Sequence, residues 1–254
     1  MYREFFPLTD GVVTLCQHAL KEIKKNFSPK RLFLQNRPSL YPQYGKVVNR
    51  SEARAKLKMD NDAIYLGHLG RATHYKNIPF LIAAVRELRK TVSSDLRLFI
   101  AGAAVSREYK QEISELCGDG IECRIDHIPE KEVATYLAAF DVSVFGFNEI
   151  WVSASMILAL SYGCPVIAPK VGGLPEYLSE NGENIFYTPG DIKEFSLAVQ
   201  NILKKNLTAD RTPRIVEFSR KYPLALSAYQ LFVARNALRR EIPNAIQTEP
   251  YLPL

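Results

Sequence analysis

Several familiar ligand-binding motifs are missing from this sequence of 254 residues. It has no GxxxxGK[ST] segment, the phosphate-binding loop of one large class of NTPases. It also lacks the dinucleotide fingerprint GxGxxG, because Gly67, Gly70 and Gly102 do not have that spacing. No zinc-binding motif and no Ser/His/Asp arrangement is present either. These absences argue against an ordinary ATP or NAD site.

Cysteines and long apolar runs are also scarce. The four cysteines, Cys16, Cys117, Cys123 and Cys164, form no CxxC pair and share no metal-ligand spacing with the four histidines. We therefore expect reduced thiols and a cytoplasmic protein. No run approaches the roughly 18–20 apolar residues of a membrane-spanning helix, and the first residues lack the apolar core of a signal peptide. Any membrane association is therefore expected to be peripheral.

The composition is that of an ordinary globular protein. Hydrophobic residues make up 47% of the chain and charged residues 24%, which is enough to bury a sizeable core. The formal net charge of +6 favours anionic partners such as nucleotides, phosphates or an acidic membrane surface. A basic surface that is merely solvated explains the same excess equally well.

Strand-like and helix-like patterns alternate through most of the chain. Short apolar runs predict strands at 64–69, 96–101, 122–125, 142–145, 166–168 and 184–187. Helical patterns lie between and after them, at 79–90, 106–117, 131–139, 153–163, after 173 and at 192–205. Such alternation with short connections predicts an α/β fold, a Rossmann-like doubly wound parallel sheet with helices on both faces.

A smaller strand–helix–strand pattern at residues 11–34 precedes this alternation. A Pro-rich segment at 37–45 separates the two and is expected to be an irregular linker. After it, Ser51 is expected to cap a helix that runs to about residue 58. Asp191 is expected to cap the helix that follows it in the same way.

Two basic residues follow the first strand of the main alternation. Arg71 and Lys76 lie in the loop that leads to the next helix, at the sheet edge where open α/β sheets bind ligands. A guanidinium offers a planar fork and an ammonium a point charge, a pairing that suits a diphosphate. The alternative interpretation is that Arg71 and Lys76 are ordinary solvent-exposed cations of a loop and bind no ligand.

Ser153, Ala154 and Ser155 begin a helix at the same edge. Backbone N–H groups, hydroxyls and the helix dipole could together seat a phosphate there. Because serines are common N-caps, the sequence alone favours a plain cap at Ser153. His127 lies just after a strand on this edge, where a solvated or structural histidine is the more common case.

Four segments together resemble the large family of retaining glycosyltransferases built from two Rossmann-like domains, the GT-B architecture. They are GHLGRATHYKNIPFLIAAV at 67–85, LRLFIAG at 96–102, DHIPEKEVATYLAAFDVSVF at 126–145 and LALSYGCPVIAPKVGGLPEYLSENGENIFYTPGD at 158–191. Each segment is weak by itself, but their order and spacing match over roughly residues 60–205. In this family the C-terminal domain binds the sugar nucleotide.

The resemblance implies roles for individual residues. Arg71 and Lys76 would hold the donor diphosphate, and the segment around His127 and Ile128 would contact the base. Glu176 would lie near the pyrophosphate or the ribose edge. The turn at Ser153, Ala154 and Ser155 would form part of the same donor site.

The sequence departs from the family pattern at a pair of glutamates. The family usually has two glutamates seven residues apart, and the second would fall at Leu158 while the first would fall at or beside Ile150. Glu149 is one residue off. The small, hydroxyl-rich turn instead resembles a variant branch among bacterial exopolysaccharide and mannosyl-type transferases. Whether transfer retains or inverts the anomeric configuration is therefore left open.

The second departure is length, because family members carry an N-terminal acceptor domain about as large as the C-terminal one. Here residues 1–45 resemble a remnant of that domain with its linker. Residues 46–210 would form the Rossmann-like nucleotide-sugar-binding domain. Residues 211–254, with a helical pattern interrupted at Pro223, would form a crossover helix and tail. The acceptor domain could belong to a separate chain.

The expected function is transfer of a sugar from a nucleotide-diphosphate-sugar donor to a glycan or lipid-linked acceptor. No metal or other cofactor is expected, because no carboxylate cluster suggests a bound divalent cation. Nucleic acid is not expected as a partner. One alternative is a non-catalytic nucleotide-sugar- or partner-binding module derived from such an enzyme. Another is a sugar-phosphate- or nucleotide-binding α/β enzyme of an unrelated family.

Overall fold

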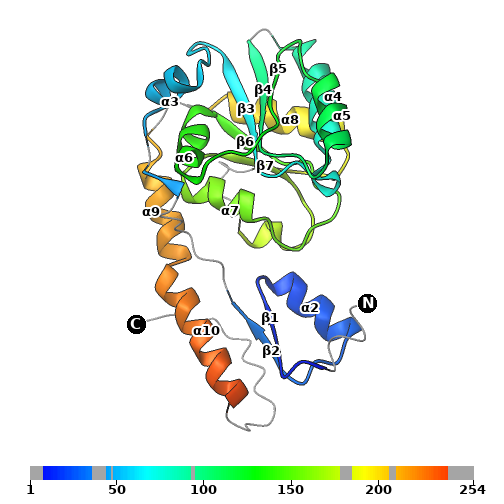
Figure 1. Ribbon diagram of the computed structural model, residues 1–254, viewed down its shortest axis with the longest axis vertical. Coiled ribbons are helices and arrows are strands. Elements are labelled where there is room, and N and C mark those ends of the chain that lie inside the picture. Colours follow the sequence, from blue (N-terminus) through cyan, green and yellow to red (C-terminus); the bar gives the residue numbers. More distant parts are fainter. Residues whose placement is uncertain are drawn as a thin grey trace.

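The computed structural model describes residues 8–35, 44–46, 48–92, 95–177, 185–205 and 210–239. Most of them belong to one domain built on a six-stranded parallel sheet (Figure 1). Its strands are β3 (Ile64–Leu69), β4 (Leu96–Ala101), β5 (Ile121–Arg124), β6 (Val142–Val144), β7 (Val166–Pro169) and β8 (Ile185–Tyr187). Their spatial order is β5-β4-β3-β6-β7-β8. This is the order of a doubly wound Rossmann sheet, so the predicted fold class is confirmed.

Helices cover both faces of this sheet (Figure 1). They are α3 (Arg50–Leu57), α4 (Ile78–Arg89), α5 (Arg107–Glu115), α6 (Glu130–Ala139), α7 (Ala154–Ser161) and α8 (Ile192–Leu203). Successive residues of a strand point to opposite faces, so the sheet supports two cores. Tyr65 on β3 packs in the core under α3, α6 and α7. Its neighbour Leu66 packs in the core under α4, α5 and α8.

A small β/α/β unit precedes the main domain. Its elements are β1 (Val12–Thr14), α2 (Gln17–Asn26) and β2 (Leu32–Leu34), and its two strands pair in parallel. Its small core is built on the buried residues Leu20, Ile23 and Leu32. The strand–helix–strand pattern predicted at residues 11–34 is therefore confirmed. Most of the predicted linker, at 36–43, lies outside the described residues.

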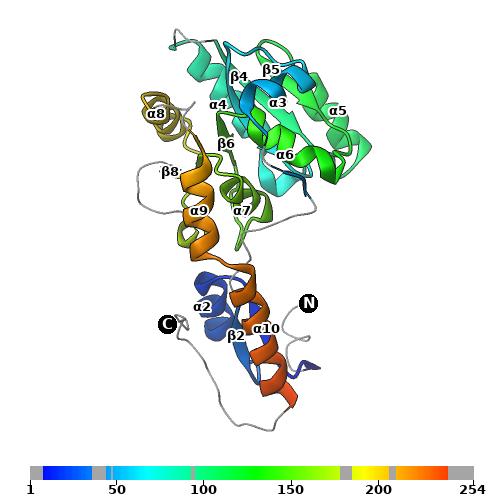
Figure 2. The same cartoon turned by 90° about the vertical axis from the view of Figure 1, so that its left-hand side faces the viewer.

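Two C-terminal helices connect the main domain with this N-terminal unit (Figure 2). They are α9 (Thr212–Lys221) and α10 (Leu224–Arg239), and the predicted interruption at Pro223 separates them. The Arg31 guanidinium donates to the Ala237 carbonyl at 2.6 Å. Gln35 donates to the Ser227 hydroxyl at 3.0 Å. These contacts hold α10 against the N-terminal unit.

The caps of two helices differ in how well the sequence predicts them. Asp191 caps α8, since its carboxylate accepts the Glu194 backbone N–H at 2.9 Å, as expected. The predicted cap at Ser51 is wrong. Asn49 caps α3 by accepting the Glu52 backbone N–H at 2.8 Å, and the Ser51 hydroxyl donates to the same Asn49 oxygen. The helix therefore starts before Ser51.

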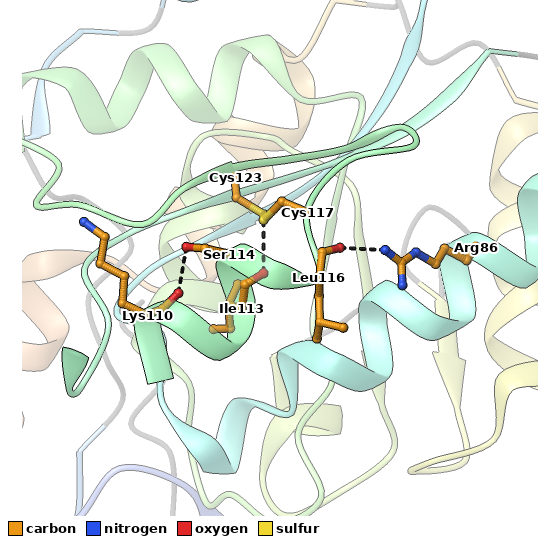
Figure 3. The surroundings of a disulfide bond; sticks show 7 residues. All are labelled: Arg86, Lys110, Ile113, Ser114, Leu116, Cys117 and Cys123. Atoms are coloured by element: carbon orange, nitrogen blue, oxygen red, sulfur yellow. Dashed lines mark hydrogen bonds between the residues drawn. A yellow bond between two sulfur atoms is a disulfide. The ribbon is translucent and has the colours of Figure 1, made fainter. Parts of the chain in front are cut away.

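The expectation that all four thiols are reduced is also wrong, because Cys117 and Cys123 form a disulfide (Figure 3). Their Cα atoms lie 6.1 Å apart. The bond joins the segment just after α5 to strand β5. A tight turn brings them together: Gly118 and Ile121 exchange backbone hydrogen bonds of 2.8 and 3.0 Å. Cys16 and Cys164 are free and buried.

The sequence predicts another helix in the segment after β7. The described residues form one 3-10 turn there, η4 (Leu174–Glu176), and residues 178–184 lie outside the described part of the chain. Among the described residues, no helix is both long and apolar enough to cross a membrane.

Candidate functional site

A cavity of about 480 Å³ opens at the carboxyl ends of β3, β4 and β5 and beside the first turns of α7. The chain winds from β3 toward β5 in one direction and from β6 toward β8 in the other, so the strand order reverses between β3 and β6. Ligands of open α/β sheets bind at such a switch point. Its lining residues are Tyr44, Leu69, Gly70, Arg71, Gly102, Ala103, Ala104, His127, Ile128, Val133, Ala154, Ser155 and Leu158.

Gly70, just after β3, marks the point where two polar groups meet. A Cβ atom at Gly70 would lie 2.6 Å from the Ser155 hydroxyl oxygen and 2.7 Å from Lys76 Nζ. Gly70 also has a φ of +138°, which other residues rarely adopt. The ammonium of Lys76 and the hydroxyl of Ser155 therefore converge on the partly buried backbone of Gly70, beside the first turn of α7.

Lys76 reaches this point from the 3-10 turn η3 (His74–Lys76). The next residue, Asn77, adopts a left-handed φ of +49°, a conformation that asparagine tolerates, and α4 begins directly after it. Lys76 is only 5% exposed, and burial lowers its pKa to about 8. Burial is the only cause of this shift, so no carboxylate among the described residues offsets it. A bound anion would compensate the buried charge.

Arg71 lines the same cavity from its exposed rim. Its loop is held in place by the neighbouring loop after β4. The Ala72 backbone N–H donates to the Ala103 carbonyl at 2.9 Å. Gly102 lies so close that a Cβ there would be 2.4 Å from the Gly70 carbonyl oxygen. The two loops thus pack against each other at the carboxyl ends of β3 and β4.

His127 and Ile128 also line the cavity, from the strand two places away from β3 in the sheet. They follow β5, with His127 exposed and Ile128 partly buried. Val133, from the second turn of α6, lines the cavity beside them. This part of the lining offers apolar surface and one imidazole, which suits a flat ring.

The two serines of the predicted turn have different positions. Ser153 is 3% exposed, and its hydroxyl accepts the Met156 backbone N–H at 3.1 Å as the N-cap of α7. It does not line the cavity, which agrees with the plain cap that the sequence favours. Ala154 and Ser155, the first two residues of the helix, do line the cavity. The polar side chain of this helix terminus that lines the cavity is therefore the partly buried Ser155.

Glu176 is not among the residues that line the cavity. Its two carboxylate oxygens accept the backbone N–H groups of Gln17 at 2.6 Å and His18 at 2.7 Å, in the first turn of α2. A carboxylate is stabilising at the positive end of a helix. A role for Glu176 at the pyrophosphate or ribose stays a prediction. In this structure its carboxylate binds the N-terminus of α2.

Sequence reasoning missed the lining residues Tyr44 and Val133, which are far apart in the chain and which no local pattern marks as neighbours. Leu158, where the family's second glutamate would fall, also lines the cavity. His68 on β3 is a buried polar residue that the sequence analysis did not single out. It is fully buried, with Nδ1 3.0 Å from the Val144 carbonyl oxygen and, within the described part of the chain, no partner for Nε2. Burial, together with the nearby charge of Lys76, lowers its pKa to about 3, so His68 is neutral.

A family model described as "Glycosyl transferases group 1" matches residues 62–205, which include most of the sheet and cavity residues. The chain belongs to this family. A D-inositol 3-phosphate glycosyltransferase of Corynebacterium efficiens is 30% identical over 201 residues, which cover 75% of this chain and 46% of that protein. The chain therefore spans about half the length of the curated relatives that it matches.

Solved structures agree with the family in fold. Sucrose-phosphate synthase of Thermosynechococcus elongatus matches with a TM-score of 0.77 at 20% identity, over 94% of this chain and 60% of that chain. HepE of Anabaena in complex with UDP and glucose matches with a TM-score of 0.76 at 16% identity, over 90% of this chain and 63% of that chain. At these identities the likeness shows a shared fold.

Proposed function

We propose that this group 1 glycosyltransferase chain provides the donor-binding half of an enzyme that transfers a sugar from a nucleotide-diphosphate sugar to a glycan or lipid-linked acceptor. One observation carries the proposal. The buried ammonium of Lys76 and the hydroxyl of Ser155 converge on the Gly70 backbone, at the N-terminus of α7 and at one end of a cavity. The charged and polar groups of such a site are preorganised to bind an anion.

The donor diphosphate would bind at this end. The buried ammonium of Lys76 would provide a point charge, and the exposed guanidinium of Arg71 would provide a planar pair of donors. The first turn of α7 would add its free backbone N–H groups. The nucleoside would extend toward His127 and Ile128. This placement is supported by the sheet order, because His127 and Ile128 follow β5, two strands away from β3, and line the same cavity as Arg71 and Ser155.

In the proposed reaction the bond between the anomeric carbon and the diphosphate oxygen breaks, and the acceptor oxygen bonds to that carbon. The acceptor hydroxyl gives up its proton, and the nucleoside diphosphate leaves with additional negative charge. Lys76, Arg71 and the α7 terminus would stabilise that charge without a metal ion. We assign no general base, because the groups that line the cavity belong to the donor side of the proposed reaction.

The names of the similar proteins support a narrower proposal. HepE was solved with UDP and glucose, and the curated relatives are D-inositol 3-phosphate glycosyltransferases. We propose a role in polysaccharide or glycolipid biosynthesis, with a second N-terminal acceptor domain and peripheral contact with a membrane surface. The formal net charge of +6 supports the membrane contact.

Isothermal titration calorimetry tests the donor site directly. UDP, GDP and ADP and their sugars are titrated into the wild-type chain and into Lys76→Ala. A charged hydrogen bond contributes about 1.5–3 kcal/mol, so the variant should bind roughly 10- to 150-fold more weakly. Lys90→Ala is the matched control, because Lys90 pairs with Glu87 in solvent, and it should bind like the wild type. If the wild type binds none of these ligands, the proposal fails.

The alternative is a non-catalytic nucleotide-sugar- or partner-binding module. Leu158 favours it, because an apolar side chain lines the cavity where the family usually has a carboxylate. Turnover separates the two functions. Donor binding without sugar transfer, measured with glycan and lipid-linked acceptors and an added acceptor domain, would favour the module.

A further inference from the structure

Helix α10 has one side that packs against the N-terminal unit. Ser227 and Ala234 are seven residues apart, so they lie on the same side of the helix, and they are 4% and 2% exposed. Gln35 of the N-terminal unit donates to the Ser227 hydroxyl at 3.0 Å on this side. Figure 2 shows α10 running along the N-terminal unit. The opposite side of α10 therefore faces away from that unit.

The opposite side of α10 exposes large apolar side chains. Leu231 and Tyr229 are each 50% exposed, and Phe232 is 58% exposed. Ala228 and Arg235 are exposed as well. Positions 228, 231, 232 and 235 have the i, i+3, i+4, i+7 spacing of a single helix face, and residue 229 lies at its edge. We call these five residues the outer face of α10, and an exposed apolar patch of this kind marks an interaction surface.

The charge around the outer face has one sign. Between Glu217 and Glu241 the sequence has five basic residues and no acidic one. Three of the basic residues are exposed in the structure: Arg220 and Lys221 at the end of α9, and Arg235 within the outer face. None of these three forms an ion pair with another described residue. Their charges are therefore available to an anionic partner.

This combination fits the surface of an anionic membrane better than a protein partner. In a protein interface Arg235 would be buried among apolar groups, and its charge would need a partner there. At a membrane surface, Leu231 and Phe232 can enter the boundary between headgroups and acyl chains while the arginine extends back to the lipid phosphates. Each basic residue near an anionic surface then strengthens binding by roughly fivefold.

We propose that the outer face of α10 is the surface by which this chain docks on an anionic membrane. The inference rests on the membrane contact in the proposed function and assigns that contact to one helix. The apolar side chains of the outer face supply the interfacial contact. Arg220, Lys221 and Arg235 supply the attraction to anionic headgroups.

Co-sedimentation of the full chain with vesicles tests this docking surface. Vesicles of phosphatidylcholine alone are compared with vesicles that also contain phosphatidylglycerol. We expect binding that requires the anionic lipid and that weakens as salt is added, because salt screens exposed charges. Equal binding to both kinds of vesicle, or binding to neither, overturns the proposal.

Variants with matched controls locate the contact on α10. Leu231→Ser and Phe232→Ser should each weaken binding to anionic vesicles by about fivefold or more, because each removes apolar area from the interface. Leu197→Ser on α8 is the control, since Leu197 is 57% exposed, and it should bind like the wild type. Arg235→Gln should weaken binding by about fivefold at low salt. Arg107→Gln, at an exposed arginine that begins α5, should not.

The remaining outcomes separate this inference from its alternatives. If the wild type binds anionic vesicles and every folded α10 variant binds equally well, the membrane contact stands but this surface is wrong. If Phe232→Ser keeps vesicle binding but abolishes self-association, or the binding of an added acceptor domain, the outer face contacts protein and the proposal is overturned. Circular dichroism checks the fold of each variant, and Arg235→Gln decides if an apolar variant does not fold.

Donor binding is measured separately on the same proteins. Calorimetry with nucleoside diphosphates should give the same affinity for Phe232→Ser as for the wild type. A wild type that binds vesicles but no nucleotide refutes the proposed donor site and leaves the docking surface intact. A wild type that binds nucleotide but no vesicle refutes the docking surface and leaves the donor site intact.

Discussion

Replacing Asp141 with asparagine tests the buried charges that support the central strands. Asp141 begins the turn into β6 and is 1% exposed. Its Oδ2 accepts hydrogen bonds from Arg54 Nη2 at 2.5 Å and from the Tyr65 backbone N–H at 2.7 Å. Its Oδ1 accepts one from Arg50 Nε at 2.8 Å. One carboxylate thus ties α3 to the junction of β3 and β6.

The magnitude follows from the position of Arg54, which is fully buried. Burial lowers the pKa of Arg54, and the charge of Asp141 opposes that shift. Asp141→Asn keeps the shape of the side chain but leaves the guanidinium without its counter-charge. Breaking a buried ion pair in this way costs about 3–5 kcal/mol. At about 2–4 °C per kcal/mol for a chain of this size, we expect Tm to fall by roughly 6–20 °C.

The assay is thermal unfolding followed by circular dichroism, with Asp95→Asn as the matched control. Asp95 also pairs with an arginine, Arg97, at 2.6 Å, but the side chains are 47% and 28% exposed. Exposed ion pairs contribute only about 0–1 kcal/mol, so this control should change Tm by a few degrees at most. If Asp141→Asn loses no more stability than Asp95→Asn, the reasoning about the buried charge is refuted.

Three further predictions concern the donor site and its support. Because the pKa of Lys76 is about 8 and a diphosphate needs the ammonium, donor affinity measured by calorimetry should fall about tenfold per pH unit above pH 8. Lys76→Arg should remove that fall, since a guanidinium stays charged; a fall of equal size in the variant would contradict the assignment. Gly70→Ala should weaken donor binding by about tenfold or more through its clash with Ser155 and Lys76, whereas Gly118→Ala, at an equally unusual φ but in open space, should lower stability without changing affinity. Glu176→Gln should destabilise the N-terminal unit by about 0.5–2 kcal/mol and speed hydrogen exchange at the Gln17 and His18 amides, and unchanged exchange would disprove the cap.

The sequence predicts the main sheet well because its strands are buried. The strands at 64–69 and 96–101 have the predicted bounds, since a strand covered on both faces is a nearly continuous apolar run. Short connections then imply parallel pairing, and the order of strands in a doubly wound sheet follows from the alternation with helices. The cap at Asp191 is also predictable, because a cap and its helix are adjacent in the chain.

Features that depend on two distant segments are not predictable in this way. Asn49 and Ser51 are both good cap residues, and the direction from which the chain enters α3 selects Asn49. The disulfide depends on the tight turn at 118–121, which aligns two cysteines that share no recognised spacing. The cavity likewise exists only in the folded chain, because Val133 of α6 and Leu158 of α7 line it together although their positions are 25 residues apart in the sequence.

The loop at 172–177 links the segment that leads into α7 to the N-terminal unit. A Cβ at Gly172 would lie 1.7 Å from the Ile150 carbonyl oxygen, and one at Gly173 would lie 2.5 Å from Cys16 Sγ. Gly172 is therefore required by a close backbone contact, and Gly173 by the Cys16 side chain and by the Trp151 carbonyl oxygen, which would lie 2.7 Å from its Cβ. Residues 150–152 lead directly into α7, and Cys16 is the N-cap of α2. The starts of α2 and α7 thus rest on the same loop.

These two helix starts differ in how their positive ends are satisfied. At α2, both oxygens of Glu176 accept backbone N–H groups, so a full negative charge already occupies that end. At α7, the cap is the neutral hydroxyl of Ser153, and the buried ammonium of Lys76 lies beside Ser155. The positive end of α2 is therefore already neutralised by Glu176, whereas no carboxylate lines the cavity beside the start of α7 among the described residues.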